Sequence, residues 1–154
     1  MPPASLDFLL ADGMLRELCR CFQGRPFSVT AATVHNTGSF VPQYANRIGN
    51  GKLDNPTPNL WFDVNAFTQP LVGTQGNAAR NILDGPPYKN FDFSVTKNNR
   101  IREGLNMQFR AELFNILNHP NFGLPNGNIS QSSKGTITSV ADGRDIQLGL
   151  KLIW

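Results

Sequence analysis

The stretch LNMQFRAEL, residues 105–113, decides the fold prediction for this chain. Apolar and polar residues alternate along all of it, and a period of two places alternate side chains on opposite faces of a β-strand. A helix is the rival, because most of these residue types favour helices and Leu105, Phe109 and Leu113 share a helical stripe. A helix would leave Met107 off that stripe, whereas a strand misplaces no residue. We therefore predict a strand.

Two more segments alternate in the same way. They are FDFSVTK, residues 91–97, and the last ten residues, DIQLGLKLIW, residues 145–154. In a soluble sheet, such strands turn one row of side chains to a core and the other to water. In an outer-membrane barrel, one row meets lipid and the other the lumen. The alternation alone fits both.

The composition is typical of a loop-rich β protein. The chain has 154 residues, 14 Gly and 11 Pro, and only 16% of its residues are charged, against about 25% in an average soluble domain. The net charge is +3, but no short window concentrates Lys and Arg as a nucleic-acid interface would, and we predict no nucleic-acid partner. No apolar run approaches the roughly 20 residues of a transmembrane helix.

Most of the Gly, Pro and Asn residues fall between the alternating segments and the start of the chain. Residues 24–34, GRPFSVTAATV, predict one short strand. Residues 36–90 then show little periodicity. Loops longer than about 12–15 residues are uncommon in compact soluble domains, whereas the extracellular loops of membrane barrels are long.

The first 21 residues look different from the rest. They show a weak helical period and lack the basic region and cleavage site of a secretory signal, so we predict a tail without an export signal. The residues of that period are Leu6, Leu9, Leu10, Met14 and Leu18.

The sequence predicts no catalytic site, metal site or cofactor. Cys19 and Cys21 are the only cysteines and have too few nearby ligands for zinc. The part of the chain after Cys21 contains no cysteine, which suits an oxidising compartment such as the periplasm. His35 and His119 are isolated, and His119 in NHPNFG is expected to be a turn residue rather than a base.

Three segments together resemble the carboxy-terminal part of the Oar-like TonB-dependent outer-membrane receptors. They are residues 76–98 (GNAARNILDGPPYKNFDFSVTKN), 105–126 (LNMQFRAELFNILNHPNFGLPN) and 144–154 (RDIQLGLKLIW). The family pattern FRAE-x-FN-x-FNHPNFG is matched by Phe109, Arg110, Ala111, Glu112, Phe114, Asn115, Asn118, His119, Pro120, Asn121, Phe122 and Gly123.

The chain also departs from this family. Ala78 and Ala79 stand where glycine is more common, Asp84 where a basic residue is common, and Trp154 where the family ends on Phe. Family members are several times longer and carry a signal peptide, a plug and most of a barrel. The resemblance therefore implies a carboxy-terminal fragment, with residues 24–154 as barrel and residues 1–23 as an unrelated or out-of-frame tail, helical or disordered.

The resemblance also implies a fold and a function. We expect an all-β fold, the last few strands of a partial transmembrane antiparallel β-barrel with long extracellular loops, in the outer membrane. The intact parent would take up a substrate with energy supplied through TonB, and the fragment would be inactive alone. Its expected partners are the barrel-assembly machinery, the plug and upstream strands of the receptor, and the lipid bilayer.

In such barrels the last strand finishes on the periplasmic side, and this fixes the expected topology. Residues 98–103 would form a periplasmic turn, and residues 116–144 an extracellular loop with a short strand at residues 136–140. The aromatic side chains Trp61, Phe62, Tyr88 and Trp154 would lie in interfacial girdles, although Trp61 and Phe62 suit the anchoring of a loop equally well.

Each predicted strand then has a lipid row and a lumen row. The polar residues expected in the lumen include Asp92, Ser94, Arg110, Glu112, Gln147 and Lys151. The residues expected to face lipid are Phe91, Phe93, Val95, Leu105, Met107, Phe109, Ala111, Leu113, Ile146, Leu148, Leu150, Leu152 and Trp154.

The end of the chain is similar to the signal that the barrel-assembly machinery recognises. Its expected elements are Gln147, Gly149, Leu152 and the terminal aromatic Trp154. The alternative is a last strand that merely ends on Trp. For the whole chain, the alternative from a different class is a secreted β-rich module that binds carbohydrate or has a structural role at the cell surface.

Overall fold

The computed structural model of this chain describes residues 4–10, 13–32 and 43–154. The chain divides into two compact units. The first, which we call the sheet unit, comprises Met1–Phe22, Tyr88–Asn121 and Ala141–Trp154. The second, which we call the loop unit, comprises Gln23–Pro87 and Phe122–Val140.

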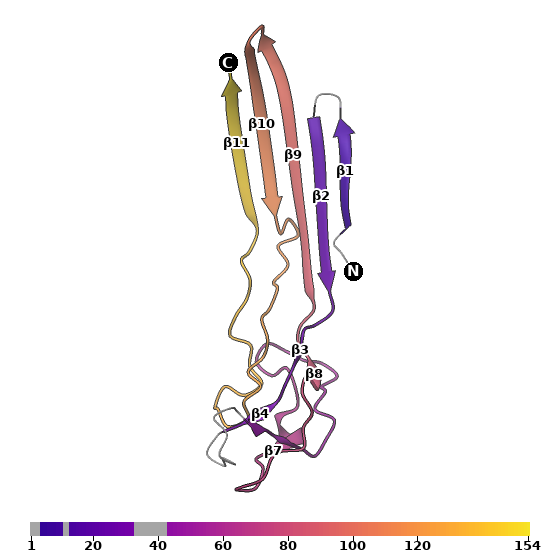
Figure 1. The fold of residues 1–154 in the computed structure, drawn as a ribbon, viewed down its shortest axis with the longest axis vertical. Coiled ribbons are helices and arrows are strands. Elements are labelled where there is room, and N and C mark those ends of the chain that lie inside the picture. The colour runs from indigo at the N-terminus through magenta and orange to yellow at the C-terminus, as the bar shows by residue number, and fades with distance from the viewer. Residues whose placement is uncertain (1–3, 11–12, 33–42) are drawn as a thin grey trace. The chain divides into compact units, whose positions relative to one another are not determined.

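The sheet unit contains one antiparallel five-stranded sheet with the order β1-β2-β9-β10-β11 (Figure 1). At 10 and 9 residues, β10 and β11 have the length that a tilted transmembrane strand needs, about 9–11 residues. The sheet does not close, and the predicted all-β fold with a partial antiparallel barrel is confirmed. Its strands are β1 (Ala4–Leu10), β2 (Gly13–Phe22), β9 (Tyr88–Arg102), β10 (Leu105–Phe114) and β11 (Asp145–Ile153).

The turn between β9 and β10 is tighter than predicted. Residues 98–102 continue β9, and only Glu103 and Gly104 connect Arg102 to its partner Leu105. Asn98 was expected in the turn, but it pairs with Gln108, whose Nε2 donates to Asn98 Oδ1 at 2.8 Å. The predicted turn was wrong in its extent because cross-strand pairing outweighs the turn preference of asparagine.

The helical interpretation of the first 21 residues was also wrong for the residues that the structure describes there, 4–10 and 13–21. β2 pairs with β9 along its full length, from Gly13 opposite Lys97 to Phe22 opposite Tyr88. β1 pairs in turn with β2. A backbone paired along ten residues overrides a weak apolar period, because the ladder supplies the hydrogen bonds that a helix would otherwise provide.

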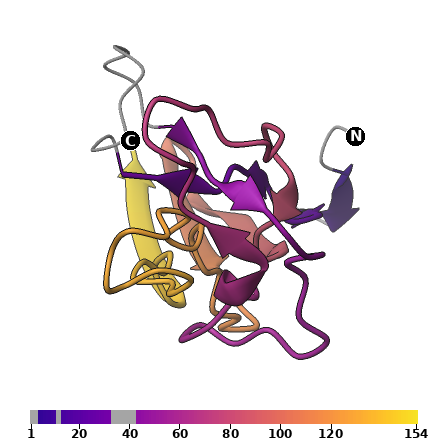
Figure 2. The ribbon, with the colours of Figure 1, turned by 90° about the horizontal axis from the view of Figure 1, so that it is seen from below.

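The described residues of the loop unit form three two-stranded ladders, β3-β8, β4-β5 and β6-β7, joined by long connections (Figure 2). One strand was predicted over residues 24–34; the described part of that segment, residues 24–32, contains two very short strands. Residues 136–140 form no strand; Val140 makes a single isolated bridge to Phe122. The elements are β3 (Pro26–Phe27), β4 (Thr30–Ala31), β5 (Gln43–Tyr44), β6 (Asn46–Arg47), the 3-10 helix η2 (Val64–Ala66), β7 (Phe67–Thr68) and β8 (Leu83–Asp84).

The hydrophobic core of the described residues lies in the loop unit. Its centre is Phe62, whose ring contacts those of Phe27 and Phe67, with centroids at 5.6 and 5.8 Å. The long segment predicted as loops is thus packed around its own core. The buried apolar residues are Phe27, Val29, Ala31, Ala45, Phe62, Ala66, Phe67, Ala78, Leu83 and Ile129.

Candidate functional site

The polar face of the sheet carries the six polar residues that were predicted to face the lumen. The register places Glu112 between Ser94 and Gln147, and Lys151 opposite Gln108. Because alternate residues share a face, Asp92, Arg110, Glu112 and Lys151 all lie on one side. Within this row, Arg110 Nη2 and Glu112 Oε1 form an ion pair at 2.7 Å.

Asp92 has a more specific role than a lumen charge. Its Oδ1 accepts hydrogen bonds from the backbone N–H of Asn115 at 3.0 Å and from Asn90 Nδ2 at 2.8 Å. Asp92 therefore ties β9 to the residue that follows β10.

The opposite face of β9, β10 and β11 is mostly apolar and exposed. One row across it is Val95, Ala111 and Leu148, and the next is Phe93, Leu113 and Ile146. Leu148 is 71% exposed and Leu150 66%. Exposed apolar surface of this extent is unusual for a monomeric soluble protein and is expected of a surface that meets lipid.

Three charged residues interrupt this apolar face, and one of them is Lys89, which lies at the start of β9 opposite Cys21. Lys97 lies beside Phe109, in the same row as Leu150, and Glu17 of β2 lies opposite Phe93. On the other face, Leu18 lies opposite Asp92. The separation into an apolar and a polar face therefore holds for β9, β10 and β11 and weakens at β2.

The predicted assembly signal lies on β11 and directly after it. Gln147 and Gly149 belong to the polar face, opposite Glu112 and Arg110, whereas Leu152 lies opposite Met107 on the apolar face. Trp154, just beyond the strand, is 91% exposed. These four side chains are thus divided between the two faces, and the terminal indole is accessible to a partner.

Sequence reasoning missed the structural role of the asparagines in FNILNHPN. Asn115 is 5% exposed; its Oδ1 accepts from the backbone N–H of His119 and its Nδ2 donates to the His119 carbonyl, both at 3.0 Å. Asn118 Oδ1 accepts from the N–H of Arg144, and Asn121 Oδ1 from that of Lys89. We call residues 115–121 the asparagine turn.

The asparagine turn orders the chain where three strands end or begin. Asn115 and Asn118 have φ of +47° and +49°, in the left-handed region that asparagine tolerates better than most residues. The sequence signal for this turn was the repetition of Asn at residues 115, 118 and 121. His119 follows the turn that the hydrogen bond from the Asn118 N–H to the Asn115 carbonyl closes, and both its backbone groups pair with the Asn115 side chain.

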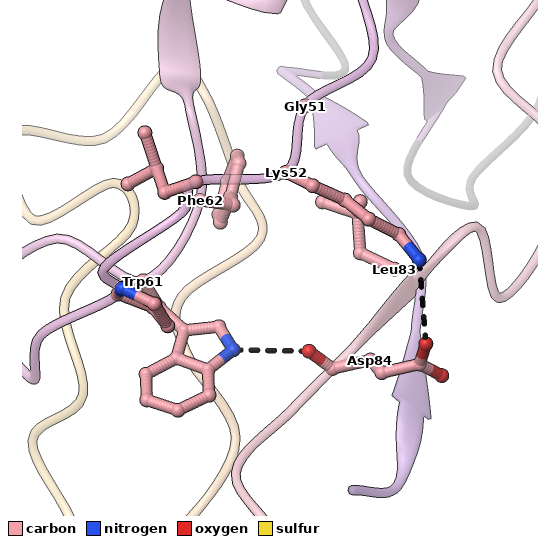
Figure 3. A pocket seen from close by; sticks show the side chains of 8 residues that line it. Gly51, Lys52, Trp61, Phe62, Leu83 and Asp84 are labelled. Carbon is pink, nitrogen blue, oxygen red and sulfur yellow. Dashed lines mark hydrogen bonds and ion pairs between the residues drawn. The ribbon is translucent and has the colours of Figure 1, made fainter.

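A pocket of about 150 Å³ opens in the loop unit beside Trp61 (Figure 3). The indole Nε1 donates to the main-chain carbonyl of Asp84 at 2.9 Å, and Lys52 Nζ lies 4.0 Å from Asp84 Oδ2. The lining residues are Gly51, Lys52, Leu53, Pro56, Trp61, Phe62, Leu83 and Asp84.

The sequence left open whether Trp61 and Phe62 lie in an interfacial girdle or anchor a loop, and the structure shows how both residues pack. Phe62 is buried in the core of the loop unit, and Trp61 is half-buried beside it. Both aromatics pack in the loop unit, and the burial of Phe62 excludes the girdle interpretation for that residue. Composition gave no indication of the pocket, because Lys52 and Asp84 are separated by 32 positions in the sequence.

The structure offers little for metal chemistry in the part of the chain that it describes. No three His, Cys, Asp or Glu side chains gather there in a way that could hold a metal ion. Cys19 and Cys21 are exposed free thiols with their sulfur atoms 3.5 Å apart. His35 lies outside the described residues. Within the described residues, no helix is long and apolar enough to cross a membrane.

Strands of transmembrane length, an exposed apolar face and a polar opposite face define a segment of an outer-membrane β-barrel. The comparison with protein families agrees with this class. The chain belongs to the outer membrane beta barrel domain family, whose model matches residues 4–147. The match begins at residue 4 and thus covers most of residues 1–23, the predicted tail. The searches of curated proteins and of solved structures found no match.

Proposed function

We propose that this chain is the carboxy-terminal part of an Oar-like TonB-dependent receptor, whose parent takes up a substrate through the outer membrane with energy from TonB. The observation that carries the proposal is the asparagine turn. The residues that produce the resemblance at 109–123 include Asn115, Asn118 and Asn121, and each makes a specific hydrogen bond at the ends of the barrel strands. The asparagines of the motif therefore have a structural role in this chain: their side chains hold the backbone where the strands end or begin.

The proposal includes a dependence on the rest of a barrel. The five-stranded sheet has two open edges, at β1 and β11, and unpaired backbone groups at an open edge cost several kcal/mol each in lipid. We propose that upstream strands of the parent receptor cover these edges and that the barrel-assembly machinery inserts the complete barrel. The chain alone would not transport a substrate.

A chimera tests the transport function. Residues 88–154 would replace the last three strands of a TonB-dependent receptor with a known substrate, in a Gram-negative host with and without TonB. We expect the chimera to reach the outer membrane and to import that substrate only when TonB is present. An inserted chimera whose uptake is independent of TonB, or a chimera that fails to insert while the parent receptor does, contradicts the proposal.

A second test concerns the assembly signal alone. In the same chimera, deletion of Trp154 is expected to reduce the inserted fraction several-fold, whereas Trp154→Phe, which keeps a terminal aromatic, leaves it nearly unchanged. The inserted fraction is measured by outer-membrane fractionation and heat-modifiable migration. Equal insertion of the deletion and the Phe variant contradicts a role for the terminal aromatic.

A further inference from the structure

We propose that the pocket beside Trp61 binds one apolar side chain of a peptide, with Lys52 and Asp84 holding the adjacent peptide unit. This site goes beyond the proposed transport function and does not depend on it, because binding is measured on the chain itself.

The interior of the pocket is apolar. Phe62 and Leu83, only 2% and 3% exposed, belong to the core, and Leu53 and Pro56 add further apolar lining. When an apolar side chain such as Leu enters the pocket, its own apolar surface and that of the pocket are both removed from water, which favours binding. A sugar ring placed against Phe62, Leu83, Leu53 and Pro56 would bring hydroxyl groups against side chains that offer no hydrogen-bond partner, which is unfavourable, and only the exposed Lys52 and Asp84 side chains could pair with them.

The indole of Trp61 is fixed before any ligand arrives. Its Nε1 is its one polar atom, and that atom donates to the Asp84 carbonyl at 2.9 Å. The ring therefore presents only carbon to the pocket, in a single orientation. A preorganised wall of this kind reduces the entropy that binding would otherwise cost.

Lys52 and Asp84 supply the polar part of the site (Figure 3). Their charged groups are 4.0 Å apart and their side chains are 63% and 65% exposed, so their ion pair is weak in water and each group stays available. The ammonium donates hydrogen bonds and the carboxylate accepts them. A peptide unit offers the complementary pair, a carbonyl and an N–H, beside the side chain that enters the pocket.

The size of the pocket limits what it holds. A volume of about 150 Å³ is below the roughly 300–1,000 Å³ of sites that enclose a whole small molecule. One side chain fits, and the rest of the peptide remains outside.

The chain contains only two tryptophans, and this gives a direct assay. In Trp154→Phe, Trp61 is the only indole, and its fluorescence reports on the pocket. The full chain carrying Trp154→Phe, in phospholipid nanodiscs, is titrated with three probes: acetyl-Gly-Leu-Gly-amide, acetyl-Gly-Gly-Gly-amide and maltotriose. We expect a saturable change with the Leu peptide, at least 10-fold weaker binding of the Gly peptide, and no response to the sugar.

Two variants in the same background test the polar part. Asp84→Asn keeps the main-chain carbonyl that orients Trp61. Asp84→Asn and Lys52→Met are each expected to weaken binding of the Leu peptide by about 3- to 10-fold. Asp54→Asn, an exposed carboxylate that does not line the pocket, is the matched control and leaves binding unchanged. No saturation with the Leu peptide, equal binding of the Gly peptide, or saturation with maltotriose overturns the proposal.

Discussion

Asn115 combines a buried side chain with a left-handed backbone, and each property constrains it differently. The side chain closes a loop to both backbone groups of His119, while the φ of +47° disfavours residues with a bulky or non-polar side chain. The backbone N–H of the same residue donates to Asp92. One residue thus joins the end of β10 to β9 and to the loop that follows.

Replacement of Asn115 by Ala is expected to lower the free energy of unfolding of the sheet unit by about 2–5 kcal/mol. Unpaired polar groups of His119 contribute about 1–3 kcal/mol, and the left-handed backbone adds about 1–2 kcal/mol. Urea denaturation of the full chain, followed by circular dichroism, measures the loss. Asn118→Gly is the comparison: it removes only the exposed hydrogen bond from the Arg144 N–H, worth about 0.5–1.5 kcal/mol, and its φ of +49° suits glycine. A loss as large as that of Asn115→Ala contradicts this role of Asn115.

The register also shows which residue is best suited to a mutational test of the lipid face. The row of Leu150 includes Lys97, whereas that of Leu148 joins Ala111, Val95 and Leu15 and is apolar throughout. A new charge is therefore expected to be least tolerated at Leu148.

Leu148→Arg is expected to destabilise the inserted barrel by about 2–4 kcal/mol, the cost of Arg on a lipid face near the midplane. Gln147→Arg places the same side chain one residue away on the polar face, near Glu112, and is expected to change stability by less than about 0.5 kcal/mol. Urea unfolding in lipid vesicles compares the two variants in the chimera described above. Equal losses would show that the two faces are assigned incorrectly.

At the scale of elements, the hairpin of β9 and β10 depends on its two-residue turn. Gly104 has a φ of +77° and open space around the position of a Cβ atom. A side chain there meets no neighbour, so any cost of substitution comes from backbone conformation alone.

Gly104→Val is expected to cost about 1–2 kcal/mol, because a β-branched residue disfavours a left-handed backbone. Glu103→Val, at the neighbouring turn position without positive φ, is the control and is expected to cost much less. Equilibrium unfolding of both variants in the full chain gives the comparison. If the two substitutions cost the same, the left-handed backbone of Gly104 is not what the turn requires.

The strands that alternate strictly were predicted with nearly correct limits. For residues 105–113 and 145–153, the local sequence pattern and the pairing between strands favour the same structure. The sequence alone was therefore sufficient to predict these strands. β2 and the extension of β9 to Arg102 were missed, because there the local pattern is weak or favours a turn and the pairing partner decides. Proximity between strands that are distant in sequence cannot be read from a local pattern.

At the scale of the whole molecule, the division into two units predicts separable unfolding. The core around Phe62 belongs to the loop unit alone. Trp61 lies in the loop unit and Trp154 in the sheet unit, so each unit carries its own fluorescent reporter.

Phe62→Ala is expected to destabilise the loop unit by about 3–5 kcal/mol, the usual cost of removing a large buried aromatic side chain. In the Trp154→Phe background, the denaturation midpoint reported by Trp61 should fall. In the Trp61→Phe background, the midpoint reported by Trp154 should stay within error. A joint shift of both midpoints would mean that the two units unfold as one.

The sequence by itself determined the class of this protein and the two faces of its principal strands. Alternation is a property of neighbouring residues, and the backbone of a strand converts it directly into an apolar and a polar face. Only the tertiary structure decided that the long segment after residue 42 packs around Phe62, that the asparagines close a turn, and that Lys52, Trp61 and Asp84 surround one pocket. Those features depend on contacts between residues far apart in the chain, which form because burial of apolar surface and pairing of polar groups are satisfied together only in the folded molecule.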